Sequence, residues 1–187
     1  IVDHFPSVSV LFADISQFTE NTSSMSPADQ IALLNRLVEA FDDAAERIGV
    51  EKVKTIGTGY MAASGLQGAR VDHGKRIVDF AIAMQRIVDS YDRESNATLG
   101  VRIGIDAGPV EAGIVGRSKF IYDLWGETVN LAYRIQSQGD ASSIVVSDTV
   151  YKRVRELYTF TQVGTIKTKS QTDAPIWQLQ THREPAT

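Results

Sequence analysis

Residues 8–14 read VSVLFAD, an apolar run of strand length, rich in β-branched residues, that ends on a carboxylate. This pattern is typical of a buried β-strand. The segment that follows is polar and turn-like, until Ser26 supplies an N-cap and Pro27 occupies the first helical position. Apolar residues then recur at helical spacing up to Ile48, and Gly49 ends the predicted helix.

The rest of the chain alternates between strand and helix patterns. The predicted elements are strands at 51–56 and 60–64, a helix over about 72–91, strands at 98–107 and 110–116 separated by a turn at Gly108-Pro109, a helix over about 127–137, a strand at 144–146, a short helix from Ser147, and two or three terminal strands. The resulting βαββαβ order predicts an α/β sandwich with a ferredoxin-like core, in which helices pack on a mixed sheet.

Length and composition indicate a globular domain. The 187 residues suit one domain, with a core at about 6–180 and a tail at 181–187. A net charge of −4 without any Lys/Arg run weighs against a nucleic-acid partner. The chain has no cysteine, which excludes disulfides and thiolate chemistry.

No stretch approaches the ~20 apolar residues of a membrane-spanning helix, so we expect no membrane contact by this segment. Because the chain starts at Ile1 without a methionine, we interpret it as a fragment of a longer protein. We expect it to be cytoplasmic, within a parent that could itself be membrane-anchored.

Asp14 lies where the first predicted strand ends and a polar loop begins. Functional carboxylates are common at such positions, but a capping or turn aspartate would look the same. The backbone N–H groups of residues 15–19 could also cradle phosphate oxygens if a helix follows.

Four segments of the chain together resemble the signature segments of class III adenylate and guanylate cyclases. They are FADISQFT (12–19), VEKVKTIGTGYMAASG (50–65), VRIGIDAGPVEAGIVG (101–116) and YDLWGETVNLAYR (122–134). The resemblance covers about residues 6–180 and keeps the family's order. It implies the class III cyclase fold and an adenylate cyclase, a phosphorus–oxygen lyase that converts ATP to 3′,5′-cyclic AMP and pyrophosphate.

The resemblance also implies a homodimer with sites at its interface. At each site one protomer holds two divalent cations, Mg²⁺ or Mn²⁺, and the partner supplies the base-recognising and transition-state groups. Asp14 matches the first metal aspartate, and the backbone carbonyl of Ile15 is the expected second ligand. Phe18 and Thr19 fall in the loop expected to bind the phosphates. Magnesium prefers hard oxygen ligands, which agrees with this assignment.

The remaining functional positions of the family are matched residue by residue. Lys54 and Asp123 match the pair that recognises adenine, a base with an acceptor at N1 and a donor at N6. Asn130 and Arg134 match the catalytic pair that orients the ribose and stabilises charge on the phosphorus. Lys167 matches the lysine that contacts the terminal phosphates, with Lys169 as the alternative.

Position 58 departs from the family, because the second metal aspartate is expected there and this chain has Thr58. Aspartate would also suit the hairpin turn better, because aspartate tolerates positive φ whereas β-branched threonine does not. Three explanations fit: a degenerate domain, an active enzyme with weakened metal binding, or a deliberate substitution. Because the other positions are kept, we favour an enzyme of reduced or metal-dependent activity.

Two further positions are unusual for the family, which has small residues where this chain has Gln17 and Tyr133. Tyr133 could crowd the purine pocket, add a contact to it, or face the sheet. His4, His73 and His182 show no ligand spacing and are interpreted as surface residues.

The alternative function is a catalytically weak or silent cyclase-like subunit that binds nucleotide or a partner cyclase, as in a heterodimer. Thr58 favours this alternative. A generic ferredoxin-like interaction domain does not account for four ordered motifs.

Overall fold

The computed structural model describes residues 2–68 and 71–181. Its elements, in chain order, are β1 (Val2–Ser16), α1 (Phe18–Asn21), α2 (Pro27–Ile48), β2 (Glu51–Ile56), β3 (Gly59–Ser64), α3 (His73–Ser95), β4 (Gly100–Val115), β5 (Ile121–Trp125), α4 (Glu127–Gln138), β6 (Ile144–Ser147), α5 (Asp148–Val154), β7 (Phe160–Lys167) and β8 (Asp173–Leu179). In the part of the chain that the structure describes, no helix is both long and apolar enough to span a membrane.

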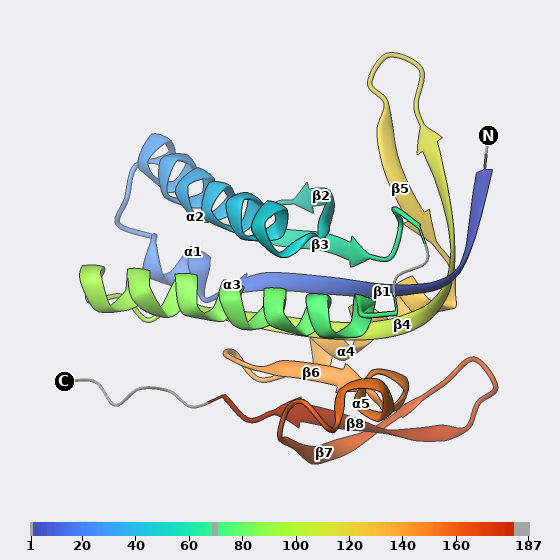
Figure 1. The fold of residues 1–187 in the computed structure, drawn as a ribbon. Coiled ribbons are helices and arrows are strands. Elements are labelled where there is room, and N and C mark those ends of the chain that lie inside the picture. Colours follow the sequence, from blue (N-terminus) through green and yellow to red (C-terminus); the bar gives the residue numbers. More distant parts are fainter. Residues whose placement is uncertain (1, 69–70, 182–187) are drawn as a thin grey trace.

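The predicted ferredoxin-like core is confirmed. Strands β1 to β4 lie in the spatial order β2-β3-β1-β4, and the sheet continues through β6 and β8 to β7. It is mixed, since β4 and β6 run parallel whereas the other pairs are antiparallel. Strand β5 pairs with the outer half of β4, and the two form a hairpin that rises away from the rest of the fold (Figure 1).

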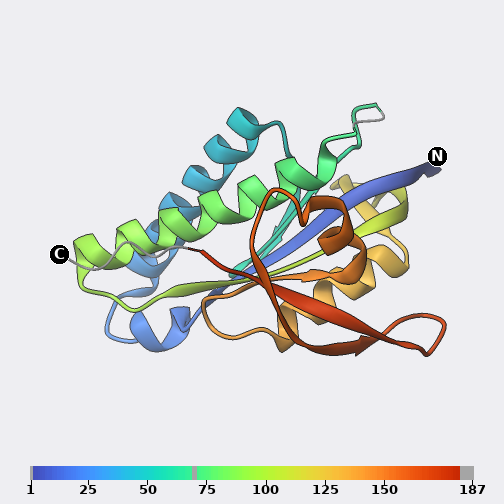
Figure 2. The same ribbon diagram turned by 60° about the horizontal axis from the view of Figure 1, so that its bottom comes forward.

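The two faces of the sheet carry different layers. Side chains of β1 alternate between the faces, as a strand requires. Leu11, Ala13 and Ile15 belong to the main core, under helices α2 and α3, which lie side by side (Figure 2). Val10 and Phe12 face the opposite layer, where α4 packs on β1 and β4. Asp14 follows Val10 and Phe12 at the same two-residue spacing and therefore points to the side of the sheet that α4 covers.

Two glycines of β4 allow α4 to approach the sheet closely. A Cβ on Gly104 would lie 2.2 Å from the backbone N of Gln136, and one on Gly108 would lie 2.7 Å from Oγ1 of Thr128. Both distances are too short for any side chain. The two glycines of β4 therefore fix how near α4 sits to the sheet.

The expected turn at Gly108-Pro109 is wrong, because β4 runs through it without interruption. The register between β1 and β4 shifts between Phe5 and Val8, opposite this point. Proline lacks a backbone N–H and is tolerated at such irregularities. The predicted helix over 27–48 is confirmed, with Ser26 as its N-cap and Gly49 ending it in a left-handed conformation.

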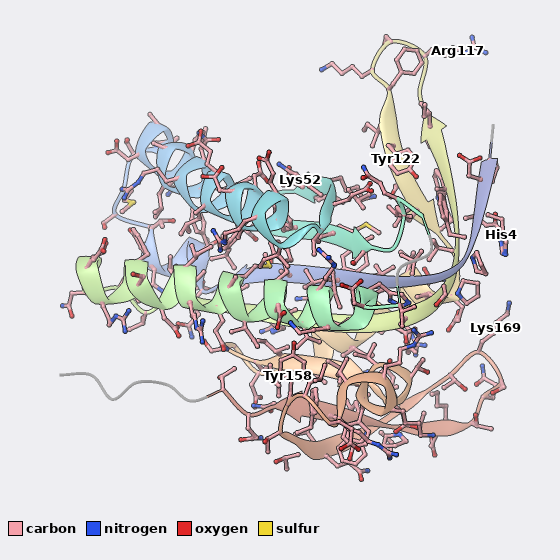
Figure 3. All side chains as sticks on the ribbon, viewed as in Figure 1. His4, Lys52, Arg117, Tyr122, Tyr158 and Lys169 are labelled. Atoms are coloured by element: carbon pink, nitrogen blue, oxygen red, sulfur yellow. The ribbon has the colours of Figure 1, made fainter. Side chains whose placement is uncertain are left out.

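The interpretation of His73 as a surface residue is also wrong. Its side chain is 2% exposed, and its ring lies within hydrogen-bond distance of Ser7, Ser9 and Arg153. Arg153 can only donate, so Nε2 accepts from it and Nδ1 carries the proton toward Ser9. His4 is exposed as expected and pairs with Glu111 near the N-terminal end of β1 (Figure 3). His182 lies outside the described residues.

Candidate active site

Asp14 lies near the end of β1, between two other strands. In the sheet it pairs with Gly59 of β3 on one side and with Arg102 of β4 on the other. Oγ1 of Thr58 donates a hydrogen bond of 2.7 Å to Oδ1 of Asp14. The backbone N of Ile15 in turn donates to the carbonyl of Thr58. The fold thus places position 58 against Asp14, as the motif predicts, with a hydroxyl where a second carboxylate was expected.

Thr58 fits its turn without backbone strain. The left-handed conformation falls on Gly57, with φ of 55°, and Thr58 is not among the residues with positive φ. The expectation that aspartate would suit this turn better is therefore not supported, because it assumed positive φ at position 58. Instead, threonine supplies a donor to a carboxylate that a second carboxylate would repel.

The donors near Asp14 suit weak cation binding. Among the described residues, no three or more histidine, cysteine, aspartate or glutamate side chains are grouped so that they could hold a metal. One carboxylate, one hydroxyl and backbone carbonyls remain. Hard cations such as Mg²⁺ accept this set when substrate phosphates and water complete their shell.

A cavity of about 390 Å³ opens beside Asp14, on the α4 side of the sheet. Its lining combines charged groups from three strands with apolar and aromatic side chains, among them Asp14, Lys54, Arg102, Phe12, Ile56 and Tyr133. This volume lies within the range of small-molecule sites, and the lining has the usual mixture of apolar walls and a few polar groups.

Lys54 and Asp123 meet across the sheet edge, although they are 69 residues apart in the chain. Nζ of Lys54 lies 2.6 Å from Oδ2 of Asp123, and the two side chains are 27% and 17% exposed. Oδ1 of Asp123 also accepts from the backbone N of Leu124. Both groups are thereby held in fixed orientations, and Lys54 faces the cavity that contains Asp14.

Arg102 is a candidate that sequence reasoning missed. It lies directly across from Asp14 in the sheet and lines the cavity. Its Nε is buried and has no hydrogen-bond partner among the described residues. A buried donor without a partner is costly unless a ligand satisfies it. The available signal was a single arginine in the strand VRIGIDA, whose other residues are apolar or glycine apart from Asp106.

The catalytic candidates of α4 have different surroundings and are not among the residues that line the cavity. Asn130 is exposed. Nη2 of Arg134 lies 2.9 Å from the carbonyl of Lys167 and 3.4 Å from Oε1 of Glu127. The Lys167 ammonium is exposed and pairs with Asp173. Lys169, the alternative to Lys167, lies at the outer end of the β7–β8 loop (Figure 3).

The expected phosphate loop forms a single helical turn, α1. Gln17 precedes it with φ of 57°, in the left-handed region, where non-glycine residues are uncommon. The Phe18 side chain is buried in the main core, whereas Thr19 is exposed. Any contact of Phe18 with a phosphate would therefore use its backbone N–H, which has no acceptor within so short a helix.

The chain matches a family model described as the adenylate and guanylate cyclase catalytic domain over residues 2–181. It is 38% identical over 179 residues to an adenylate cyclase of Mycobacterium tuberculosis. The alignment covers 96% of this chain and 40% of the relative, so the chain spans about two fifths of that protein.

Solved structures with the same fold include a guanylate cyclase domain from Catenaria anguillulae in complex with GTP. The two chains are 31% identical, with a TM-score of 0.88 over 97% of this chain and 100% of the other. The catalytic core of a rhodopsin-guanylyl cyclase with converted specificity, in complex with ATPαS, is 32% identical, with a TM-score of 0.88 over 95% and 97% of the two chains. Similarity this extensive in sequence and fold makes the chain a member of the adenylate and guanylate cyclase catalytic-domain family.

Proposed function

We propose that this chain is an adenylate cyclase domain that converts ATP to 3′,5′-cyclic AMP and pyrophosphate. The observation that carries the proposal is the Lys54–Asp123 pair beside the cavity that holds Asp14. A carboxylate can accept from the N6 amino group of adenine, and an ammonium can donate toward its N1. Guanine presents a donor and an acceptor in the reverse arrangement, so the same pair would reject it.

We further propose that the working unit is a homodimer with a composite site. Asn130 and Arg134 lie outside the cavity, and in the proposed dimer a second copy would bring its α4, together with its own Lys54–Asp123 pair, to the Asp14 of the first. The β4–β5 hairpin supports this assembly, because it carries several exposed apolar side chains, namely Ile114, Val115, Phe120 and Ile121. Exposed apolar clusters of this kind mark interaction surfaces.

Asp14, the backbone carbonyl of Ile15 and the hydroxyl of Thr58 are the groups proposed to hold Mg²⁺ or Mn²⁺, two ions per site. Such ions, when bound, neutralise phosphate charge and acidify a ribose hydroxyl. With a single carboxylate, the affinity of the site for the cation would be low until the triphosphate contributes its own oxygens. The geometry therefore favours metal that enters together with the nucleotide.

In the proposed reaction the ribose 3′-oxygen forms a bond to the α-phosphorus, and the bond from that phosphorus to the oxygen bridging to the β-phosphate breaks. The 3′-hydroxyl loses its proton to solvent water, and pyrophosphate leaves. Asn130 would orient the ribose, and the planar guanidinium of Arg134 would donate to the α-phosphate oxygens. Arg102 and Lys167 would hold the terminal phosphates, and the backbone N–H groups of Phe18 and Thr19 would assist them.

We propose that residues 6–180 act as one catalytic unit, and its substrate ATP favours a cytoplasmic location. A second candidate function is a silent or weak cyclase-like subunit that binds nucleotide or a partner cyclase in a heterodimer. The specific observation in its favour is the hydrogen bond from Thr58 to Asp14, which occupies a metal-facing carboxylate oxygen with an uncharged neighbour.

The test is a cyclase assay on the purified protein with ATP and with GTP, each in Mg²⁺ and in Mn²⁺. The adenylate cyclase proposal predicts cyclic AMP with either metal, more of it with Mn²⁺, and little cyclic GMP. Nucleotide binding without cyclic product under all four conditions would support the silent subunit instead. Cyclic GMP as the main product would show that Lys54 and Asp123 do not select the base.

A further inference from the structure

Tyr133 places an aromatic ring in the wall of the cavity. It projects from α4 and lines the same cavity as Lys54 and Asp14. Its side chain is 55% exposed, which is high for an aromatic residue in a cavity wall. Exposed aromatic surface beside a fixed charge pair is a feature expected where a flat ligand is to be covered.

The ring is held in place by its surroundings. It meets Phe12 of β1 edge to face, with the ring centroids 5.5 Å apart and an interplanar angle of 82°. The helix beneath it cannot shift toward the sheet, because Gly104 already lies against the backbone of Gln136. The Tyr133 side chain is therefore anchored on one edge and open to the cavity.

We propose that Tyr133 is the stacking wall for the purine ring, a role that rests on the proposed function of the same site. A base whose edge bonds to Lys54 and Asp123 would enter the cavity whose wall carries the tyrosine ring. Stacking on an aromatic side chain depends on the π-face, which every base has, and therefore does not discriminate between bases. The Lys54–Asp123 pair selects the base, whereas Tyr133 adds affinity for any purine.

A stacking role for Tyr133 and simple obstruction of the cavity by its ring predict different effects on nucleotide binding. A ring that merely crowded the cavity would weaken nucleotide binding, and its removal would tighten it. A stacking ring would strengthen nucleotide binding, and its removal would weaken it. Its hydroxyl is dispensable in the stacking role, because the π-face alone contacts the base.

The experiment uses the full chain with Tyr133→Ser and Tyr133→Phe, and Leu157→Ser as a matched control at an exposed site outside the cavity. Calorimetry would measure the Kd of 3′-deoxy-ATP and 3′-deoxy-GTP, which lack the attacking hydroxyl, and steady-state assays would give KM and kcat. Thermal unfolding would verify that each variant is folded.

We expect Tyr133→Ser to raise Kd and KM by about tenfold, the scale of one base–aromatic stack, and by the same factor for both nucleotides. Values of kcat should change less than twofold, and Tyr133→Phe and Leu157→Ser should behave as wild type. Unchanged or tighter binding in Tyr133→Ser would overturn the proposal, as would a loss confined to one nucleotide. A wild-type chain that binds both analogues but makes no cyclic product would refute the proposed function alone, and the binding data would still decide the role of Tyr133.

Discussion

The residues in or beside the cavity and the residues of α4 and β7 that are proposed to act on the nucleotide differ in how they are held. Lys54 and Asp123 form a short, largely buried ion pair, and Asp14 is bonded to Thr58. The Arg134 and Lys167 side chains are 40% and 61% exposed and are paired to groups of their own chain. The cavity half is therefore preorganised, whereas the half from α4 and β7 must exchange its present partners for those of the substrate.

The largest effect is expected when the carboxylate of the cavity half is removed. Asp14→Ala should lower cyclase turnover by about 1,000-fold or more, equivalent to ~4 kcal/mol of transition-state stabilisation. Asp43→Ala, which removes an exposed aspartate of α2, serves as the control and should change nothing. Turnover of Asp14→Ala close to wild type would take Asp14 out of the reaction.

A smaller effect is expected when the base-selecting pair is exchanged. Lys54→Glu combined with Asp123→Ser supplies an acceptor and a donor in the positions that guanine requires. The ratio of kcat/KM for ATP to that for GTP should fall by about 100-fold, because mismatched polar groups in a dry pocket discriminate strongly. Lys52→Glu reverses the charge of a nearby lysine that pairs with Asp42 and should leave the ratio unchanged.

A still smaller effect is expected from adding a second carboxylate beside Asp14, at position 58. Thr58→Asp would place two carboxylates within hydrogen-bond distance, so the metal concentration for half-maximal activity should fall about tenfold, equivalent to ~1.4 kcal/mol. Without metal the two charges repel, and this variant should unfold at a lower temperature than wild type. Thr58→Asn is the neutral control of similar size. An unchanged metal curve for Thr58→Asp would mean that position 58 does not face the cation.

The smallest effect concerns Asp106, a buried carboxylate of β4 near the start of α4. Burial raises the pKa of Asp106 to about 6, opposed by hydrogen bonds from Ser147 and the Ala107 backbone, while Glu127 nearby raises it further. Above pH 6 the folded protein must keep this charge buried, so Asp106→Asn should be more stable at pH 8 by about 1 kcal/mol.

The stability gain of Asp106→Asn should shrink as the pH falls from 6 toward 4. Over this range the native aspartate takes up a proton that the unfolded chain still lacks, which stabilises the wild-type fold. Denaturant unfolding of both proteins from pH 4 to pH 8 gives the difference directly. A difference that does not vary with pH would show that Asp106 does not titrate in this range.

The local pattern of the sequence predicted the elements with strong signals. Ser26, Pro27 and Gly49 set the bounds of α2 to the residue, since capping depends on neighbours in the chain. The pairing of Lys54 with Asp123 came from the family resemblance, because no periodicity relates residues so far apart. Gly108 and Pro109 wrongly predicted a turn. Such residues fit inside a long strand when a partner strand shifts register, as β1 does, and the local sequence does not show that shift.

Features that depend on packing between distant elements could not be predicted. The burial of His73 requires Ser7 and Ser9 of β1 and Arg153 of α5 to converge on it. Likewise, Arg102 becomes a candidate phosphate ligand only through its register opposite Asp14. The conformation of Thr58 could not be predicted either, because it depends on which residue of the hairpin adopts positive φ. Gly57 and Gly59 flank Thr58, and positive φ falls on Gly57.

Mixing two inactive variants decides whether Asp14 of one chain works with α4 of another. Asp14→Ala and Arg134→Ala chains carrying different tags would be co-expressed, and mixed dimers isolated by two successive affinity steps. One of the two sites in such a dimer contains both intact residues, so turnover should return to about half that of the wild-type dimer. Mixed dimers as inactive as either parent would contradict the claim and place Asp14 and Arg134 in the same chain's site.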